Sequence, residues 1–367
     1  MDAIAAKKEA KSKKTAPARL LELSQHPDSS VQLAVSKHAS TPVAALEYLS
    51  GHGKFTILKA VAVHPSTLSA TLERLALHKQ HTVVEVVANN LNTPLATLER
   101  LAAHPHEAVR KALTSNRAVT PALLETLSRD ADSSVRYCVA ANDDCPIALL
   151  ERLSADESED VRGCVAKHRH TPIAFLEKLA LDSATRVRSQ VAASNTASLE
   201  LVRELANDTE AEVRSSTVLR LLRDQQHDLL MVLVRDPAAQ VRHWISRIIE
   251  ARSRIIDGDF LVNLISQLSC DPDARIRKEI AGCRNLDLTT LEQLLEDPQS
   301  EVRRSLAYNK TGSTPIFILE RLATDPDQDV RWQVAYNNSV TAPILERLAS
   351  DQSVRVRTLA LSKLGQP

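Results

Sequence analysis

Residues 135–160 have the sequence VRYCVAANDDCPIALLERLSADESED, and residues 161–186 follow the same plan as VRGCVAKHRHTPIAFLEKLALDSATR. Each stretch opens with Val-Arg, passes through a polar loop and continues into a Leu-rich segment that precedes an Asp. A unit of about 26 residues that recurs in this way is typical of a solenoid, in which each unit packs only on its neighbours.

The first residue of the Val-Arg pair is an anchor that can be followed along almost the whole chain. The first seven steps between anchors are 26 residues each, and the later steps are 28, 35, 26, 28 and 26. The anchors are Val31, Ile57, Val83, Val109, Val135, Val161, Val187, Val213, Val241, Ile276, Val302, Val330 and Val356. We therefore predict a single elongated all-α solenoid of about thirteen helical repeats.

Residues 93–116 show how one repeat is built. Thr93-Pro94 favours a helix start, because Thr caps helices and Pro suits the first helical position. Apolar residues follow at helical spacing, and a second helix is expected from Val109 to Asn116. Asn tolerates left-handed backbone, so we expect it to act as a C-cap. The same Asn recurs as Asn90, Asn142, Asn309 and Asn337. Both helices are too short to be stable alone, so stability must come from stacking.

The chain resembles the variant leucine-rich repeat family. The segment that carries the resemblance runs from Val135-Arg136 through Asn142, Pro146 and Leu149-Leu150-Glu151-Arg152-Leu153 to Asp156. The resemblance covers roughly residues 20–223 and 271–363, and the Asp and Val-Arg pattern is also similar to HEAT repeats. It implies short helices alternating with tighter helical turns in a right-handed superhelix. Some members carry an N-terminal cysteine cluster for an iron–sulfur centre, which this sequence lacks, so we expect no cofactor.

Repeat regularity divides the chain into four segments. We expect a basic flexible N-terminal arm (1–16), regular repeats (17–223), irregular longer HEAT-like repeats (224–275) and C-terminal repeats (276–367). The arm contains Lys7, Lys8, Lys11, Lys13 and Lys14. Its composition favours a disordered tail, and a phosphate-touching arm is the alternative.

The irregular segment has lost the Asn and Thr-Pro pattern. Its helices look longer and more apolar, as in residues 229–234, and a loop near Arg252–Phe260 contains Gly258. These repeats either change the curvature of the solenoid or provide a partner-contact loop or hinge.

Composition excludes several classes of protein. The formal net charge is zero, so no global field draws the chain to nucleic acid or a membrane. No apolar run approaches 18 residues, and the N-terminus has no apolar signal segment. Five Cys, an odd number without a close pair, fit a reducing compartment. We expect a cytoplasmic protein, with a monomer favoured.

An Asp stands six residues before the Arg in nine repeats. These pairs are Asp130/Arg136, Asp156/Arg162, Asp182/Arg188, Asp208/Arg214, Asp236/Arg242, Asp271/Arg277, Asp297/Arg303, Asp325/Arg331 and Asp351/Arg357. In HEAT-like folds such residues bridge within and between repeats. Earlier repeats have His26 before Gln32, His52 before Leu58 and His78 before Val84, and only Arg110 stands with a His, His104. Joint loss of both partners is what an ion-pair ladder predicts, because an unpaired, half-buried charge is costly. A phosphate-binding Arg stripe is the weaker alternative.

The four His at a period of 26 residues raise the question of a metal site. Neighbouring repeats should lie roughly 10 Å apart, whereas zinc needs each His nitrogen about 2 Å from one ion. The sequence His168-Arg169-His170 with Cys164 lacks a fourth ligand. We therefore predict no metal site.

By resemblance to HEAT-like solenoids, the second helix of each repeat is expected to line a concave face. The residues two and six positions after each anchor share one side of that helix. This stripe carries seven Lys or Arg against one acid, Glu85, which favours an acidic partner. Aromatic residues join it near the C-terminus, and such residues are enriched at binding hot spots. The expected groove comprises Lys37, Lys59, Lys111, Tyr137, Lys167, His243, Arg247, Lys278, Arg304, Tyr308, Trp332 and Tyr336. The alternative for Trp332 and the tyrosines is packing between helices.

Catalytic motifs are missing from the sequence. It has no GxGxxG, Walker loop, HExxH, CxxC or GxSxG pattern. We predict a non-catalytic scaffold that binds an acidic protein or peptide. The alternative is a nucleic-acid-binding HEAT-like protein that uses the same Lys/Arg stripe, related to the glycosylases that act on alkylated DNA.

Overall fold

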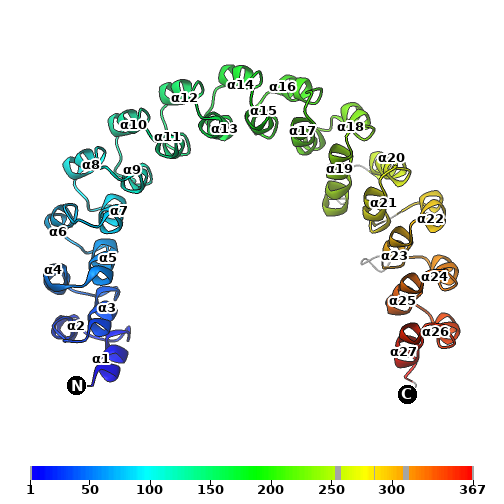
Figure 1. Ribbon diagram of the computed structural model, residues 1–367, viewed down its shortest axis with the longest axis horizontal. Helices are drawn as coiled ribbons and strands as arrows, with labels where there is room; N and C mark the ends of the chain where they lie inside the picture. The colour runs from blue at the N-terminus through cyan, green and yellow to red at the C-terminus, as the bar shows by residue number, and fades with distance from the viewer. Residues whose placement is uncertain (1, 253–257, 285, 309–313, 366–367) are drawn as a thin grey trace. The chain divides into compact units, whose positions relative to one another are not determined.

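Helices make up the regular secondary structure in the computed structural model, which describes residues 2–252, 258–284, 286–308 and 314–365 (Figure 1). The chain forms two compact units, Met1–Leu179 and Ala180–Pro367. The first unit contains α1 (Ala3–Ala10), α2 (Pro17–Ser24), α3 (Ser29–Ser36), α4 (Val43–His52), α5 (Phe55–Val63), α6 (Ser69–Leu75), α7 (His81–Asn89), α8 (Leu95–Leu101), α9 (Glu107–Thr114), α10 (Pro121–Leu127), α11 (Ser133–Ala140), α12 (Ile147–Leu153), α13 (Glu159–Lys167) and α14 (Ile173–Leu179). The second unit contains α15 (Thr185–Ala192), α16 (Leu199–Leu205), α17 (Ala211–Arg223), α18 (His227–Leu233), α19 (Ala239–Arg252), α20 (Gly258–Ser269), α21 (Ala274–Ala281), α22 (Leu288–Leu295), α23 (Ser300–Tyr308), α24 (Ile316–Leu322), α25 (Gln328–Tyr336), α26 (Ala342–Leu348) and α27 (Val354–Lys363).

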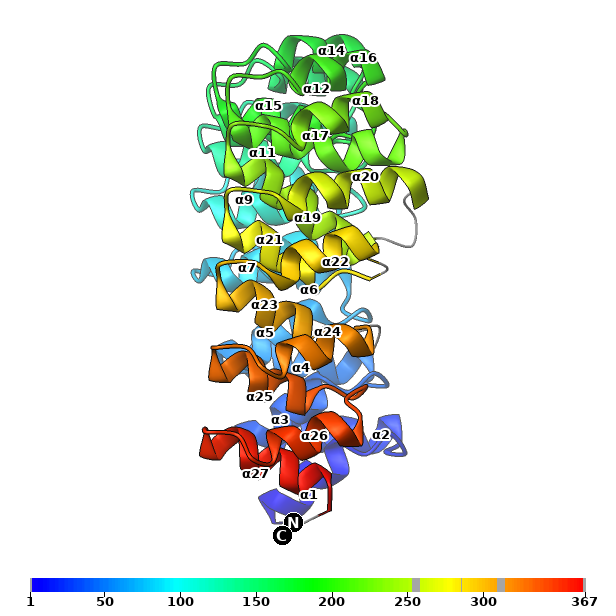
Figure 2. The ribbon, with the colours of Figure 1, turned by 90° about the vertical axis from the view of Figure 1, so that its right-hand side faces the viewer.

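Each unit consists of two layers of helices. A repeat is one even-numbered helix and the odd-numbered helix that follows it, such as α8 and α9. Within each unit, odd-numbered helices pack on the odd-numbered helices of the neighbouring repeats, as α7 does on α5 and α9. Figure 2 shows the same arrangement in the second unit, where α21, α23, α25 and α27 pack side by side in chain order. The predicted all-α repeat solenoid is confirmed, and the handedness of its superhelix stays a prediction.

The anchors form the centre of the core. All thirteen anchor side chains have no exposed surface. The residues four and five positions later, such as Val87 and Ala88 in α7, are buried with them in every repeat before the last. Burying one Val or Ile side chain contributes about 1.5–3 kcal/mol. Because an isolated helix of this length is unstable in water, these contacts between repeats are what hold the helices in place.

The expected helix cap at Thr93 is wrong. Helix α8 begins at Leu95, and Pro94, not Thr93, precedes it. The buried hydroxyl of Thr93 instead donates a hydrogen bond to the main-chain oxygen of Val87, at 2.6 Å. Thr120 does act as an N-cap, since its hydroxyl oxygen accepts the N–H of Leu123 at 3.3 Å. The Thr-Pro pattern therefore serves two purposes that look the same in sequence.

The recurring Asn does end helices, since Asn90 and Asn337 are the C-cap residues of α7 and α25, but the expected left-handed backbone is wrong. Among the described non-glycine residues only Gln225 has a positive φ, whereas Asn90 has φ −77° and ψ 130°. The side-chain N–H of Asn90 crosses to the preceding repeat and donates to the main-chain oxygen of Ala62 at 2.8 Å, and its Oδ1 accepts the N–H of Asn92 at 2.9 Å. Asn116, Asn142 and Asn337 make the same crossing bond. Asn309 lies outside the described residues. The recurring Asn thus joins consecutive repeats.

The N-terminal segment is helical, which corrects the expectation of a flexible arm for 1–16. Residues Ala3–Ala10 form α1, which packs on α3 with Ala6 and Ala10 fully buried. The Nε of Arg19 pairs with Glu9 at 2.9 Å and fixes the following turn. Small Ala residues between the lysines supply the apolar side of this helix, a pattern that the Lys count concealed.

The irregular repeats contain longer helices, as expected, but not where the apolar run suggested. Within 224–275, α19 and α20 have 14 and 12 residues, and α17, which ends at the boundary before them, has 13. Helix α18, which holds most of the run 229–234, has only seven. Residues 253–257 of the proposed hinge loop lie outside the described residues. The segment boundaries at 223 and 275 stay predictions, because the two compact units are divided by their contacts rather than by repeat regularity.

Candidate interaction site

The Asp–Arg ladder is present, but each Arg pairs with the Asp of the following repeat and not with the Asp six residues before it. We call this choice of partner the register of the ladder. Arginines of the ladder form bidentate ion pairs with the Asp of the following repeat, with Nε to Oδ2 distances of 2.5–2.7 Å. The pairs are Arg110–Asp130, Arg136–Asp156, Arg188–Asp208, Arg214–Asp236, Arg242–Asp271, Arg277–Asp297, Arg303–Asp325 and Arg331–Asp351. The Asp six residues earlier offers only its main-chain oxygen, as Asp130 does to Arg136 at 2.9 Å. The hydrogen bonds from Arg331 hold the pKa of Asp351 below its usual value.

The expected ion pair between Arg162 and the carboxylate of Asp156 is wrong for the same reason. That carboxylate binds Arg136 of the preceding repeat. Arg162 instead donates from Nη1 to the main-chain oxygens of Asp156 at 2.6 Å and of Glu157 at 3.1 Å. The expected pairs Asp182/Arg188 and Asp208/Arg214 are corrected in the same way, since both arginines donate to the main-chain oxygen of that Asp, at 2.8 and 2.7 Å. Each of these arginines thus fixes the loop before its own helix through main-chain oxygens.

This register explains why Arg110 stands beside a His in the sequence. The carboxylate partner of Arg110 is Asp130 in the next repeat, and His104 supplies only a main-chain oxygen, at 2.7 Å. His104 also accepts the N–H of His106 on Nδ1, just as Asp130 accepts the N–H of Asp132 on Oδ1. His26 and His78 make the same turn. His26, His78 and His104 therefore replace Asp in a backbone turn, whereas His52 ends α4 and contacts the main-chain oxygen of Tyr48 through Nδ1. The ladder arginines are engaged in contacts within the fold.

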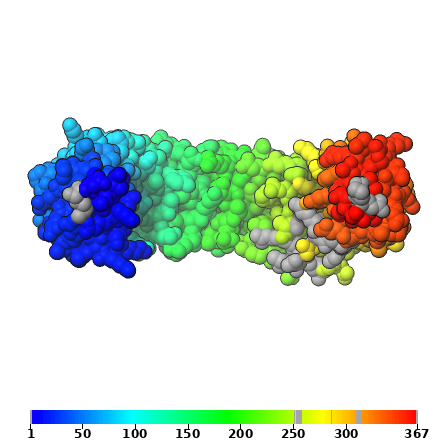
Figure 3. Space-filling view, turned by 90° about the horizontal axis from the view of Figure 1, so that it is seen from below, coloured from blue at the N-terminus to red at the C-terminus, as the bar shows by residue number. Residues whose placement is uncertain are grey.

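The surface proposed as a groove lies on the odd-numbered helices and on the segments that follow them. Of its twelve residues, five belong to the first unit and seven to the second, and all have accessible side chains. The residue six positions after the anchor is exposed in most repeats. The residue two positions after the anchor is buried in three repeats, as Gly163, Ser189 and Ser215, and accessible in the others. In the space-filling view the colours follow chain order within each unit (Figure 3).

The sequence stripe captured only part of this surface. Helix geometry also places the residues one position before and three positions after each anchor on the same side, and we call all four positions the odd-helix face. The added positions contribute the acids Asp160, Glu212, Glu279, Glu301 and Asp329 and the arginines Arg186, Arg275 and Arg355. The face then carries ten Lys or Arg against six acids. The basic excess persists but is smaller than the original stripe indicated.

An aromatic cluster lies at the C-terminal end of the second unit. The rings of Trp332 and Tyr336 stack with centroids 5.3 Å apart and planes 12° apart. The guanidinium of Arg355 lies 4.4 Å from the Trp332 ring centroid and pairs with Asp329 at 3.1 Å. Nζ of Lys363 donates to the main-chain oxygen of Tyr336 at 2.9 Å. Arg355 and Lys363, which the sequence analysis missed, hold the rings in place.

A small pocket adjoins this cluster. It has a volume of about 150 Å³ and is lined by Arg304, Asp329, Trp332, Gln333 and Arg355. The core of α25 is filled by Val330, Val334 and Ala335, so Trp332 is not needed to fill it and stays half-exposed. Arg304 and Trp332, both residues of the expected groove, line this pocket together.

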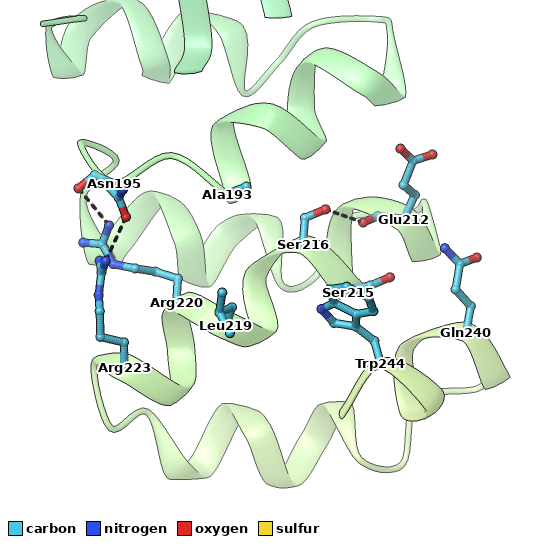
Figure 4. A pocket seen from close by; sticks show the side chains of 10 residues that line it. All are labelled: Ala193, Asn195, Glu212, Ser215, Ser216, Leu219, Arg220, Arg223, Gln240 and Trp244. Atoms are coloured by element: carbon cyan, nitrogen blue, oxygen red, sulfur yellow. Dashed lines mark hydrogen bonds between the residues drawn. The ribbon is translucent and has the colours of Figure 1, made fainter. Parts of the chain in front are cut away.

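A larger pocket on α15, α17 and α19 was not foreseen from the sequence. It has a volume of about 450 Å³, within the range typical of ligand pockets. Figure 4 shows Leu219 between Arg220 and Arg223 at one end and Trp244 at the other. Leu219 and Trp244 are each 41% exposed. Trp244 stands three positions after its anchor, on the part of the odd-helix face that the sequence stripe left out.

Charged groups of opposite sign border this pocket. The Nε of Arg220 pairs with Asp224 at 2.5 Å, and Arg223 lies 3.2 Å from the same carboxylate. The hydrogen bond from Arg220 lowers the pKa of Asp224. Two guanidinium groups thus share one acid. Glu212 lines the pocket from the start of α17.

The structure offers little support for thiol chemistry. Burial raises the pKa of Cys145 and of Cys164 to about 11, so both thiols stay protonated and weakly nucleophilic at neutral pH. In the described part of the chain, no three His, Cys, Asp or Glu side chains are grouped as a metal ion would need. No described helix combines the length and apolarity required to cross a bilayer.

Comparison with known proteins finds similar solved structures. A leucine-rich repeat variant with a repetitive structural motif is 23% identical, covers 63% of this chain and 86% of its own, and has a TM-score of 0.46. Kap95p, in a structure that concerns its binding to RanGDP, is 14% identical over 96% of this chain and 53% of its own, with a TM-score of 0.35. Importin beta is 12% identical over 94% of this chain and 62% of its own, with a TM-score of 0.33.

No protein-family model matches the chain, and no curated protein matches it. The helical repeat architecture accordingly rests on the helix pairs and buried anchors of the chain itself, with the leucine-rich repeat variant and importin beta among the structures similar to it.

Proposed function

We propose that the chain is a non-catalytic repeat scaffold that binds an acidic protein or peptide on its odd-helix face. The observation that carries this proposal is the C-terminal cluster, where Trp332 and Tyr336 stack beside Arg355 without serving as core residues. Trp, Tyr and Arg are the residue types that dominate binding energy at protein interfaces. Stacking against neighbours also fixes their rotamers before a partner arrives, which lowers the entropic cost of binding.

Charge supports an acidic partner. The ladder arginines are neutralised by their Asp partners, so they do not attract ligands. They also lie outside the odd-helix face, whose own Lys and Arg outnumber its acids, while the whole chain is neutral. An acidic surface on the partner is therefore complementary to this face, which increases specificity and association rate more than affinity.

Nucleic-acid binding is the competing function, and its chemistry differs in a measurable way. Contacts to several phosphates release counterions, so affinity falls steeply as salt is raised. Contacts centred on aromatic side chains fall less. The N-terminal segment is helical and is not a free basic arm, so one feature that favoured nucleic-acid binding is removed.

The test is capture of partners from the native cytosol at about 0.1 M salt, with and without nuclease. We expect a nuclease-resistant protein that is lost with Trp332→Ala but retained with Phe317→Ala, which removes an exposed aromatic from the even-numbered helix α24, off the odd-helix face. The melting temperature of Trp332→Ala should stay near that of the parent protein. Recovery of nucleic acid that depends on Lys111 and Lys167, or a collapsed melting temperature for Trp332→Ala, contradicts the proposal.

A further inference from the structure

We propose that the pocket on α15, α17 and α19 binds an extended segment of about five residues, with an apolar side chain in the middle and an acidic residue at one end. This proposal rests on the proposed function, since the segment would belong to the acidic partner. It assigns a second contact point, separate from the C-terminal cluster, and a chemical pattern for what occupies it.

The middle of the pocket suits an apolar side chain. Leu219 and Trp244 expose large apolar surfaces, and the small side chain of Ala193 leaves room beside them. The guanidinium of Arg247 lies 5.8 Å from the Trp244 ring centroid and so helps to hold the indole. Regular core positions of α17 and α19 are filled by Val213, Val218, Val241 and Ile245. Leu219 and Trp244 are therefore surplus to the core and free to contact a ligand.

The acidic residue belongs at the Arg223 end. The guanidinium of Arg220 is engaged in contacts within the fold, because its Nη1 donates to the main-chain oxygens of Ser194 and Asn195 and its Nε pairs with Asp224. Arg223 is 53% exposed on its side chain and donates to Oδ1 of Asn195 at 2.8 Å. Since Asp224 is the only carboxylate that the two arginines pair with in the described residues, this end has an excess of positive charge.

The other end sets the length and polarity of the segment. Glu212 is exposed at the opposite end of α17, and Gln240 of α19 lines the pocket with it. The eleven helical steps from Glu212 to Arg223 correspond to about 16 Å. An extended chain advances about 3.3 Å per residue, so about five residues span this distance. Glu212 repels a carboxylate, so the far end of the segment is basic or neutral.

The experiment uses the two tryptophans as separate reporters. The chain contains only Trp244 and Trp332, so Trp332→Phe leaves Trp244 as the single reporter of this pocket, and Trp244→Phe leaves Trp332 as the reporter of the C-terminal cluster. A phage-displayed library of random pentapeptides is selected on the full-length Trp332→Phe protein. We expect enrichment of an apolar residue followed by Asp or Glu, and selected synthetic peptides should shift the emission of Trp244.

Charge reversal tests the orientation. Arg223→Glu should weaken these peptides at least about tenfold, and replacing the peptide acid by Lys should restore binding to that variant. Arg235→Glu is the matched control, because Arg235 also donates one hydrogen bond to a side-chain amide, that of Gln267, away from the pocket. Leu219→Ala is a second variant that should lower affinity without changing charge. Circular dichroism melts should match for all of them, since these side chains are largely outside the core.

Several outcomes overturn the proposal. A selection without enrichment, peptides that leave Trp244 emission unchanged, or equal effects of Arg223→Glu and Arg235→Glu each contradict it. Failure of the pocket is distinguishable from failure of the proposed function. If the cytosolic partner alters the emission of Trp332 but not of Trp244, the scaffold function stands and the pocket assignment falls. If the cytosol yields only nucleic acid, the scaffold function itself falls.

Discussion

The repeats up to α9 and the repeats from α10 onward close the same turn with different chemistry, with a His in three of the former and an Asp in the latter. His78 and Asp271 stand at equivalent positions, and each accepts a main-chain N–H from two residues later, on Nδ1 and Oδ1 respectively. Asp271 also pairs with Arg242 of the preceding repeat, whereas the residue that corresponds to Arg242 before His78 is Leu58. The turn therefore does not need the ladder. The carboxylate has two separable roles, shaping its own loop and joining two repeats.

We call one Arg–Asp ion pair of the ladder a rung. The largest effect should come from breaking the most buried rung. Asp271→Ala leaves the guanidinium of Arg242, 10% exposed, without its carboxylate, which should cost about 3–5 kcal/mol. His78→Ala removes only the turn hydrogen bond and should cost about 1 kcal/mol. Thermal and denaturant unfolding of both variants measure the difference. Equal losses would show that the turn, and not the rung, carries the stability.

Building a rung in the N-terminal repeats tests the register directly. Val84 is fully buried where later repeats have Arg, and the equivalent partner in the following repeat is His104. Val84→Arg alone should destabilise by about 3 kcal/mol, because it buries an unpaired charge. Adding His104→Asp should recover about 1–3 kcal/mol as a coupling energy.

The control for this rescue is His78→Asp, which supplies the carboxylate within the same repeat. It should not rescue Val84→Arg, because the rung joins consecutive repeats. Rescue by His78→Asp and not by His104→Asp would mean that the ion pairs form within a repeat. A double-mutant cycle on unfolding free energies distinguishes the two cases.

A smaller loss of stability is expected when a less buried rung is removed. That loss should still exceed the loss caused by removing an exposed cation. Arg188→Ala removes two hydrogen bonds to Asp208 and one to the main-chain oxygen of Asp182, and should cost about 2 kcal/mol. Lys167→Ala changes an exposed side chain and should stay within about 0.5 kcal/mol. Melting temperatures of the two variants check this expectation. Similar values would indicate that the pairs of the ladder contribute little.

Sequence periodicity was enough to predict the fold, because burial of one anchor per repeat leaves a strict pattern. It could not give the register of the ladder. The spacing of Asp130 and Arg136 is constant within a repeat, yet Arg136 reaches the carboxylate of Asp156 across the interface. Pairing along the sequence and pairing across repeats have the same period, so only the direction of the side chain decides between them.

The pocket escaped prediction for a related reason. Leu219 lies on the stripe of residues two and six positions after the anchors, but Trp244 stands three positions after its anchor and so lies outside that stripe. Arg220 and Arg223 lie near the C-terminal end of α17, a helix of 13 residues in which no standard repeat position predicts them. Departures from the repeat carry the local chemistry, and a method based on the repeat overlooks them.

The smallest effect concerns pH and again contrasts His with Asn at one position. His168 accepts the N–H of His170 on Nδ1 and contacts the main-chain oxygen of Asn142 through Nε2, as Asn142 itself contacts Thr114. Burial lowers the pKa of His168. The neutral ring is therefore favoured in the folded state, and its contribution to stability is complete above about pH 6.5, the usual value for His, and declines as the pH falls below it.

His168→Asn should keep both hydrogen bonds without a proton to gain, so its melting temperature should fall less than that of the parent between about pH 7 and 5. Ladder carboxylates such as Asp351, whose pKa is lowered, lose their contribution only below about pH 4, so the two effects occur in separate ranges. His52→Asn, which removes an exposed imidazole, is the control. The contrary result is a parallel decline of the melting temperatures of His168→Asn and the parent protein over this range. In that case the His at this position acts only as a hydrogen-bonding group, equivalent to the Asn of the other repeats. Burial of its ring then gives the N-terminal unit no sensitivity to pH.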